Sequence, residues 1–245
     1  MTVERRNFPQ FFITATSPCP YLPGQKERKV FTHLVGPDAK LLASQLLQGG
    51  FRRSQSIAYR PACEMCNACA STRVPVQRFR WTKGFKRVMK ANADLVSNAA
   101  QPQAMAEHYD LFRAYIDTRH SDGGMADMSV LDFAAMIDET VVDTRLIEYR
   151  YGPSHKNAGQ LVGTVLLDVM ADGLSLIYSF YDPTEQRRSL GTYIILDCIL
   201  KTLRLNLPFL YLGYYVAGSS KMEYKSRFQP QERLTPAGWD SLTFS

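Results

Sequence analysis

Residues 178–196 read YSFYDPTEQRRSLGTYIIL, and this stretch joins an apolar strand to a helix through a polar loop. The loop contains the Asp-Pro pair and the Gly that interrupt regular structure, and apolar residues resume after it at helical spacing. The first turn of a helix leaves main-chain N–H groups free, so this turn is suited to receive an anionic group. We therefore treat the stretch as the centre of a ligand site; an ordinary helix start capped by Thr184 or Ser189 is the alternative.

The segments around this stretch follow the pattern of a mixed sheet. A turn at Asp172-Gly173 joins two of the strands. We expect strands at 144–151, 161–170, 174–181 and 209–216, and helices at 192–205 and 221–228. Three strands, a helix and a further strand are the order of an acyltransferase-type sheet of the GNAT kind. The sequence thus predicts an α/β (mixed α+β) fold with a GNAT-like acyltransferase domain at 101–245.

The loop meets half of the motif by which GNAT enzymes hold the pyrophosphate of acetyl-CoA. Arg188 and Gly191 have the spacing of its first half. Tyr193 stands where a second small residue is wanted, and a bulky ring there would crowd a pyrophosphate. Ser189, Gly191 and Tyr193 are therefore expected to line a substrate site on a GNAT-like scaffold, and the use of coenzyme A is in doubt.

A small N-terminal domain that contains cysteines is expected at 1–100. Ser129 and Asp132 have the pattern of a capping box, which predicts a helix start in the segment that follows this domain. In this half of the chain we expect helices at 38–48, 83–97, 103–119 and 129–138, and extended segments at 51–61 and 73–80.

Three of the five cysteines lie in RPACEMCNACAST, residues 60–72. Three thiolates in one turn suit a soft tetrahedral ion that takes a fourth ligand from elsewhere. Cys19, in a Pro-rich turn, is the first candidate for that ligand, and His33 and His120 are weaker ones. The expected metal set is thus Cys19, Cys63, Cys66 and Cys69, holding zinc or an iron–sulfur cluster; free thiols are the alternative. Cys198 lies in an apolar helix and reads as a core thiol.

Composition bounds the location and the partners of the chain. The 245 residues contain no apolar run of about 18 residues, so we expect no membrane span. The first residues show no secretory signal, and the odd number of cysteines argues for a reducing, cytoplasmic location. A net charge of +6 suits a polyanionic partner such as RNA, although a solvated basic surface explains it equally well.

Five motifs resemble the aminoacyl-tRNA–protein transferases. They are SPCPYLPGQ, YRPACEMCNACASTRVPV, RHSDGGM, YSFYDP with SLGTYIIL, and YLGYYVAGSSKMEYKSRFQP. The short length and RHSDGGM are similar to the bacterial branch, the aspartate/glutamate leucyltransferases. The resemblance implies transfer of leucine from leucyl-tRNA to the α-amino group of proteins that begin with Asp or Glu, which marks them for degradation by the N-degron pathway. It also implies a GNAT-like fold without acetyl-CoA.

The same resemblance bears on cofactors. Eukaryotic relatives bind an iron–sulfur cluster or zinc through a paired CxxC near the N-terminus, and here Leu22 replaces the second cysteine of that pair. The transfer itself requires no cofactor, because the aminoacyl ester is already activated and the attacking amine, with a pKa of about 8, is partly neutral at pH 7. Positioning of the two reactants could then remove about 7–11 kcal/mol of the barrier.

Candidate residues for this chemistry lie along the strands that flank the central helix. Asp182 is the candidate base or amine-orienting group, and Tyr178 or Tyr181 the candidate donor to the 3′ oxygen. The acidic acceptor side chain needs a cation, for which the candidates are Arg78, Arg80, Arg119, Lys221 and Lys225, with His120 beside Arg119. The tRNA phosphates could bind a stripe formed by Lys83, Lys86, Arg87 and Lys90.

Three other functions stay open. Arginyl transfer to the same acceptors would need an acidic pocket for the arginine side chain of the donor, and the sequence does not locate such a pocket. An acetyl-CoA-dependent N-acetyltransferase would need room for the pyrophosphate at Tyr193. A zinc-knuckle RNA-binding module would bind tRNA without regard to its aminoacylation.

Overall fold

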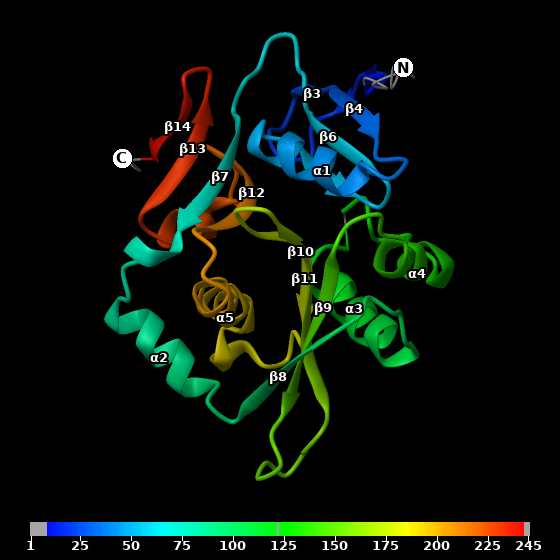
Figure 1. The fold of residues 1–245 in the computed structure, drawn as a ribbon. Coiled ribbons are helices and arrows are strands. Elements are labelled where there is room, and N and C mark those ends of the chain that lie inside the picture. Colours follow the sequence, from blue (N-terminus) through cyan, green and yellow to red (C-terminus); the bar gives the residue numbers. More distant parts are fainter. Residues whose placement is uncertain (1–8, 122, 243–245) are drawn as a thin grey trace, which may run out of the picture.

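The computed structural model describes residues 9–121 and 123–242, and a mixed eight-stranded sheet organises the chain (Figure 1). Its order is β14-β13-β7-β12-β11-β10-β9-β8, and only the neighbours β11 and β12 run parallel. The strands are β7 (Cys69–Pro75), β8 (Leu95–Ala100), β9 (Thr144–Tyr151), β10 (Leu161–Met170), β11 (Gly173–Tyr181), β12 (Phe209–Val216), β13 (Gln231–Thr235) and β14 (Gly238–Leu242).

Helices cover both faces of this sheet. Figure 1 shows α2 (Lys83–Ala91) and α5 (Leu190–Arg204) on one face, and α3 (Ala106–Arg119) and α4 (Val130–Asp138) on the other. Successive side chains of β10 point to opposite faces, as the period of two requires. Val165 accordingly packs in the core with α5, and Leu166 packs in the core with α3 and α4.

A second layer, built from the N-terminal residues, lies against one end of the large sheet. Four antiparallel strands form it in the order β1-β4-β6-β5, together with one helix and a two-stranded hairpin. Its elements are β1 (Phe12–Ile13), β2 (Ser17–Pro18), β3 (Lys26–Glu27), β4 (Lys29–His33), α1 (Ala39–Gln48), β5 (Arg52–Ser54) and β6 (Ile57–Pro61). Leu34, Leu47 and Ala58 of this layer share a hydrophobic core with Met170 and Tyr211 of the large sheet.

One buried ion pair joins the two layers. The Arg53 guanidinium donates from Nε and Nη2 to the Asp168 carboxylate of β10, at 2.6 and 2.7 Å. Thr144 donates to the same carboxylate at 2.7 Å, and the Arg53 and Asp168 side chains are 5% and 2% exposed. A buried charge without its partner is strongly destabilising, so this pair determines where β5 sits on the large sheet.

The large sheet is continuous across residue 100, where we predicted a domain boundary. β7 and β8 come from before that residue, and they pair with β12 and β9 from after it. The sheet therefore draws on both predicted domains. Within it, the order β9, β10, β11, α5, β12 is the GNAT-like acyltransferase arrangement expected from the sequence.

Most of the predicted elements are confirmed. The strands expected at 144–151, 161–170 and 209–216 have those bounds, and Ser129 and Asp132 form the expected capping box. The short helical segment expected at 221–228 is a 3-10 helix, η3 (Glu223–Arg227), and two further 3-10 turns are η1 (Val76–Arg78) and η2 (Gln186–Arg188).

Two predicted elements are wrong in part. The helix expected at 83–97 ends at Ala91, because the buried Asn92 side chain donates to the carbonyls of Val88 and Arg188, and the chain then continues as β8. The extended segment expected at 73–80 ends at Pro75, where β7 loses its partner in β12. In both places a tertiary contact overrides the local pattern.

Two statements from the sequence concern residues that the structure does not fully describe. The segment interpreted as lacking a secretory signal includes residues 1–8, and RHSDGGM includes residue 122; these lie outside the described residues. Among the helices that are described, none is both long enough and apolar enough to cross a bilayer.

Candidate active site

The candidate active site lies where the two parallel strands of the sheet separate. β11 and β12 pair only from Gly173↔Phe209 to Ser175↔Tyr211, although both strands continue beyond these pairs. We call the unpaired stretches, residues 176–181 and 212–216, the β11–β12 gap. Main-chain groups on both sides of such a gap must find other partners, because no ladder satisfies them.

Each strand carries an irregularity at the start of the gap. On β11, Leu176 and Tyr178 face consecutive residues of β10, which leaves Ile177 as an extra residue. On β12, Tyr211 and Gly213 face consecutive residues of β7, which leaves Leu212 as an extra residue. Bulges bend a strand and increase its twist, so two bulges at the same level are the local reason why the strands part here.

Arg52, from β5 of the N-terminal layer, lies in the gap. Its Nη2 donates to the carbonyl oxygens of Leu176 and Ile177, at 2.7 and 3.2 Å. On the other side, a Cβ placed on Gly213 would lie 1.4 Å from Nη1 of Arg52. Gly213 also has a φ of +77°, which favours glycine. The Arg52 side chain therefore spans from β11 to β12, and only glycine at 213 leaves room for it.

A second cation, Lys225, approaches the next residue of β12. Its Nζ donates to the Tyr214 carbonyl at 2.6 Å, and the residue is 6% exposed. Burial, with a smaller contribution from the positive charge of Arg52, lowers the pKa of Lys225 to about 7. The ammonium form is disfavoured because desolvation and a like charge both act against it.

These two cations lack the carboxylate partners that other shielded arginines have. Arg53 pairs with Asp168, Arg73 with Glu232, and Arg188 with Asp94, at 2.6, 2.8 and 2.7 Å respectively. Among residues 9–121 and 123–242, no ion pair includes Arg52 or Lys225. Shielded charges are normally paired, so the gap has a surplus of positive charge that suits an anionic ligand group.

Tyrosines surround this charge on two sides. Toward α3, the Tyr115 and Tyr181 rings pack at an interplanar angle of 60° with their centroids 4.9 Å apart, and Tyr178 and Tyr224 lie near enough to Tyr115 to affect its pKa. Toward the N-terminal layer, the Tyr214 hydroxyl donates to the Gly50 carbonyl at 2.9 Å. Burial raises the pKa of Tyr115 above its usual value and that of Tyr178 to about 12. These phenols therefore stay protonated at neutral pH and can act as hydrogen-bond donors.

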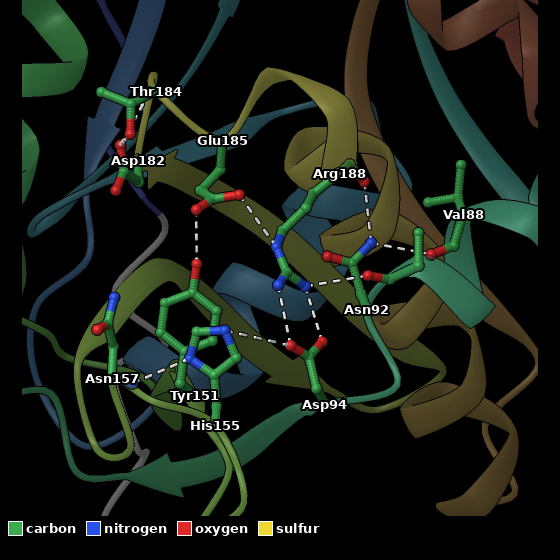
Figure 2. Close-up of polar contacts among 11 residues, drawn as sticks. Val88, Asn92, Asp94, Tyr151, His155, Asn157, Asp182, Thr184, Glu185 and Arg188 are labelled. Atoms are coloured by element: carbon green, nitrogen blue, oxygen red, sulfur yellow. Dashed lines mark hydrogen bonds and ion pairs between the residues drawn. The ribbon is translucent and has the colours of Figure 1, made fainter.

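Side chains of the loop after β11 form hydrogen bonds and ion pairs with one another and with neighbouring segments, as Figure 2 shows. Arg188 donates to both oxygens of Asp94, at 2.7 and 2.9 Å, and to Glu185 at 3.0 Å. Glu185 also accepts a hydrogen bond from Tyr151 at 2.6 Å, and His155 stacks on the Tyr151 ring at 3.8 Å. The loop is thereby tied to the start of β8 and to the hairpin between β9 and β10.

At the start of α5, Tyr181 occupies the space in front of the predicted phosphate motif. A Cβ on Gly191 would lie 2.9 Å from the Tyr181 ring and from its hydroxyl oxygen. Gly191 is thus small because a tyrosine packs on it. Two residues before Gly191, Ser189 has a φ of +52° and accepts hydrogen bonds from the main-chain N–H groups of Thr192 and Tyr193 through its carbonyl.

Two family models match this chain. The model of the N terminus of arginine-tRNA-protein transferases matches residues 17–87, and the model of the C terminus matches residues 107–235. The chain belongs to this family. The interval between the two models contains residue 100, whereas the large sheet takes strands from both matched regions.

Close relatives cover almost the whole chain. An aspartate/glutamate leucyltransferase of Methylorubrum extorquens is 57% identical and covers 98% of both chains. One of Nitrobacter hamburgensis is 55% identical over 98% of this chain and 94% of the relative. Among solved structures, L-PGS from Bacillus licheniformis aligns with a TM-score of 0.46 at 9% identity over 78% of this chain, which spans about half (55%) of that structure.

In this transferase, some predicted site residues do lie together. Tyr181 contacts Tyr115, the Arg119 guanidinium carbon lies 6.0 Å from the Tyr181 ring centre, and His120 Nε2 lies 3.3 Å from the Tyr115 hydroxyl. Tyr178, Tyr181 and Lys225 border the β11–β12 gap, whereas Arg119 and His120 lie on the far side of Tyr181 and Tyr115. Two of the predicted acceptor-binding residues are therefore close to a predicted aromatic donor, and a third lies at the gap.

Other predicted residues have different surroundings. The Asp182 carboxylate accepts hydrogen bonds from the Thr184 main chain and side chain, at 2.8 and 2.6 Å, so it stabilises the turn after β11; its role as a base stays a prediction. Arg78 is exposed and pairs with Glu232 at 2.8 Å. Arg80 and Lys221 are exposed and have no described contact with the gap.

The prediction that Tyr193 lines the substrate site is wrong. Its side chain is 6% exposed and packs edge-on against Tyr149 in the α5 core, with ring centroids 5.6 Å apart. Position 193 lies four residues after Ser189, slightly more than one helical turn, and is on the buried face of α5. The ring therefore contributes to the core and does not crowd the loop.

The four predicted metal-binding cysteines share one neighbourhood. Burial, and then the nearby Cys19, Cys63 and Cys66, raise the pKa of the Cys69 thiol to about 11. Arg28 connects the segment that contains Cys19 to the segment that contains the other three cysteines, because it donates to Thr16 at 3.1 Å and to Glu64 at 2.8 Å. Cys198 is buried in the α5 core, as predicted.

One other cluster among the described residues has metal-type ligands. Glu107, His108 and Glu148 place ligand atoms within 4.8 Å of one another. However, Arg150 pairs with both carboxylates, and His108 Nδ1 accepts the Met105 N–H at 3.2 Å. The carboxylates are thus neutralised by a guanidinium, and the cluster joins α3 to β9. The cysteines differ from this cluster in that no ion pair of the described residues involves their side chains.

Arg52, Tyr115 and Tyr224 were missed at the level of sequence. Arg52 stands in FRRSQ beside Arg53, and nothing local distinguishes the arginine that enters the gap from the one that pairs with Asp168. A signal did exist at the other side of the contact. Gly213 interrupts the apolar strand FLYLGYYV, and an isolated glycine in a strand often marks the close approach of another group.

Replacing Gly213 should be much more damaging than replacing a glycine with the same backbone conformation. Gly218 has a φ of +81°, and a Cβ there would meet only Leu22 at 4.0 Å. We expect both G213A and G218A to show the strain of a left-handed residue, about 1–2 kcal/mol. G213A should cost a further 1–3 kcal/mol or so, because the methyl group and Arg52 cannot both be accommodated.

Urea unfolding of the two variants and the parent protein measures this difference. Equal losses of unfolding free energy in G213A and G218A would show that Arg52 does not depend on the space above Gly213.

Proposed function

We propose that this chain transfers leucine from leucyl-tRNA to the α-amino group of proteins that begin with Asp or Glu, and so marks them for degradation by the N-degron pathway. The observation that carries the proposal is the 55–57% identity, over 98% of the chain, to relatives named aspartate/glutamate leucyltransferase. The partners are then an aminoacyl-tRNA and an acidic protein N-terminus.

The geometry of the gap suits this reaction. An aminoacyl ester needs no further activation, so the main task is to hold it beside the acceptor amine, which can supply up to about 7–11 kcal/mol. The phenol hydroxyls of Tyr178 and Tyr181, next to the gap, are donors for the oxygen that becomes negative during attack, and removing one such donor typically costs about 10²–10³-fold in rate. Neither role requires a cofactor.

Acetyl transfer from acetyl-CoA fits the loop less well. The Tyr181 ring packs on Gly191, and Arg188 is committed to Asp94 and Glu185. A pyrophosphate at this helix start would have to displace both contacts. We therefore favour an aminoacyl-tRNA donor on the same scaffold.

A transfer assay tests the proposal. Leucyl-tRNA and arginyl-tRNA, each labelled in the amino acid, are mixed with peptides that begin with Asp, Glu or Ala. We expect label to enter the Asp and Glu peptides from leucyl-tRNA, at a rate at least about a hundredfold above that of the Ala peptide. The arginyl donor is included because the family model is named for it; transfer from arginyl-tRNA alone would replace leucine by arginine in the proposal.

We propose that α2 binds tRNA phosphates. Lys83, Lys86, Arg87 and Lys90 are exposed on this helix, whereas Phe85 is buried beneath them. Asn92 connects the end of α2 to the Arg188 carbonyl, so this cationic face is held at a fixed distance from the loop after β11. Contacts of this kind would add affinity without selecting among tRNAs.

Salt dependence separates phosphate contacts from a merely solvated face. We expect K86A/R87A to weaken tRNA binding and to lower the slope of log Kd against log salt concentration by about 2, one for each lost phosphate contact. Filter binding between low and physiological salt measures the slope. K40A/R204A, which removes two exposed charges elsewhere, is the control and should leave the slope unchanged; an unchanged slope in K86A/R87A would count against the stripe.

We also propose that the four neighbouring cysteines hold a soft metal ion or an iron–sulfur cluster. Four thiols are the donor set that zinc and iron–sulfur clusters prefer. In the described residues, no three of these sulfur atoms all lie within 4.8 Å of one another. A closed zinc site needs sulfur–sulfur distances of roughly 3.8 Å, so a bound metal would draw the loop of Cys19 toward the loop of Cys63, Cys66 and Cys69. All five cysteines are free thiols, which suits the reducing cytoplasm that we propose as the location.

Metal titration tests this site. Under reducing conditions we expect the parent protein and C198A to bind about one Zn²⁺ per chain, and C66S to bind it at least about tenfold more weakly, because one of the four ligands is lost. Reconstitution with iron and sulfide, followed by its visible absorbance, distinguishes a cluster from zinc. Equal affinity in C66S and the parent protein would exclude this ligand set.

A further inference from the structure

We propose that Arg52 is the residue that recognises the acidic side chain of the acceptor, with Lys225 as a supporting positive charge behind it. This inference rests on the proposed function, since it assigns the acceptor preference of that reaction to one side chain. Arg52 lies on β5, in the N-terminal layer, and in this proposal it contacts a substrate that is bound at the large sheet.

The first reason is charge. Arg52 and Lys225 contact consecutive residues of β12, Gly213 and Tyr214, and neither has a carboxylate partner among the described residues. Two cations this close repel each other, and a carboxylate between or beside them would remove the repulsion. The first residue of an Asp or Glu acceptor brings such a carboxylate.

The second reason is geometry. Arg52 uses Nη2 for the Leu176 and Ile177 carbonyls, so the guanidinium plane is held by β11 before any ligand arrives. Arginine offers five donors, and those on Nε and Nη1 remain to donate to a carboxylate. Arg52 is only half-buried, unlike Lys225, so it is the cation that a ligand can reach.

The third reason is distance from the chemistry. Tyr224 lies near both Arg52 and Tyr181, because both affect its pKa. Tyr181 in turn packs on Gly191 at the start of α5. An acceptor residue whose carboxylate meets Arg52 can therefore extend its α-amine toward the tyrosines.

The other cations are less suited to this role. Arg119 and His120 stand at the end of α3, beyond Tyr115 and Tyr181. Arg78 is exposed and already pairs with Glu232. Arg52 is the candidate that combines a fixed orientation, partial burial and an unsatisfied charge.

The test compares two acceptor peptides that differ only in their first residue, Asp or Asn, at a fixed concentration of leucyl-tRNA. Asn has the shape of Asp without its charge. In the parent protein we expect kcat/KM for the Asp peptide to exceed that for the Asn peptide by about thirtyfold or more. R52Q should reduce this ratio to near one. R60Q is the matched control, because Arg60 also donates to a main-chain carbonyl, that of Gly49, from the neighbouring strand, and it should keep the ratio.

Two outcomes would overturn the assignment. One is a folded R52Q that keeps the Asp preference of the parent. The other is an equal fall in rate for both peptides, with the ratio unchanged, which would mean that Arg52 only supports the strands. If the parent transfers leucine to neither peptide, the proposed function fails instead.

A second measurement uses the parent protein and does not depend on the folding of a variant. Phenylglyoxal modifies accessible arginines, and mass spectrometry locates the modified residue. The Asp peptide should protect Arg52 at least about tenfold more than the Asn peptide, since a bound carboxylate occupies the guanidinium donors. Equal protection by both peptides contradicts the proposal even when no transfer occurs.

The pH dependence of the Asp/Asn ratio examines Lys225. Its surroundings are Arg52 of β5, the Tyr214 carbonyl of β12, Tyr224 of η3, and Gln231 of β13, which donates to its carbonyl. Because a carboxylate favours the ammonium form, the ratio should fall by up to about tenfold from pH 6 to pH 8 as Lys225 loses its proton. The β-carboxylate raises the pKa of the α-amine of the Asp peptide above that of the Asn peptide, so the peptides themselves contribute to the pH dependence of the ratio. K225M keeps this contribution, so the fall is measured relative to the K225M profile, and identical profiles in K225M and the parent would remove Lys225 from the proposal.

Discussion

The rest of this structure depends on a single guanidinium group that occupies the place of a missing strand ladder. Where β11 and β12 part, the carbonyls of Leu176 and Ile177 lose the partners that a regular parallel sheet would give them. Arg52 supplies N–H donors to these carbonyls, and Gly213 leaves the space on the opposite strand. The opening is thus stabilised by a charged side chain that can also face a ligand.

This arrangement joins the N-terminal layer to the candidate active site. Arg52 and Arg53 are adjacent on β5, so their side chains point in opposite directions. Arg53 reaches the buried Asp168 and anchors the layer, and Arg52 reaches the gap. The cysteine loops adjoin the same region. Burial and the nearby Tyr59 raise the pKa of Tyr21, Arg52 lowers it, and Cys69 raises it, so Tyr21 lies near both Arg52 and a cysteine. A metal at the cysteines would stiffen the layer that holds Arg52.

The loop after β11 shows how a GNAT-like scaffold can serve a different donor. In acetyl-CoA enzymes the amides at this helix start face a pyrophosphate. Here Tyr181 packs on Gly191, and Arg188 closes the loop through Asp94 and Glu185 (Figure 2). The glycine that the motif requires is present, but the group that it accommodates is a phenol. The same residue pattern therefore supports different binding, depending on what packs against it.

Local sequence determined most of the regular structure, since apolar periodicity and turn residues act between neighbours in the chain. The strands at 144–151, 161–170 and 209–216, the capping box at Ser129 and the helix after Gly191 follow from such local terms. The family motifs also pointed to the transferase family. Tertiary structure alone decided that Asn92 ends α2, that Tyr193 enters the core, and that Arg52 rather than Arg53 lies in the gap. These outcomes depend on partners tens of residues or more away, Arg188, Tyr149 and Gly213, and no local pattern encodes a contact with a residue that only folding brings near.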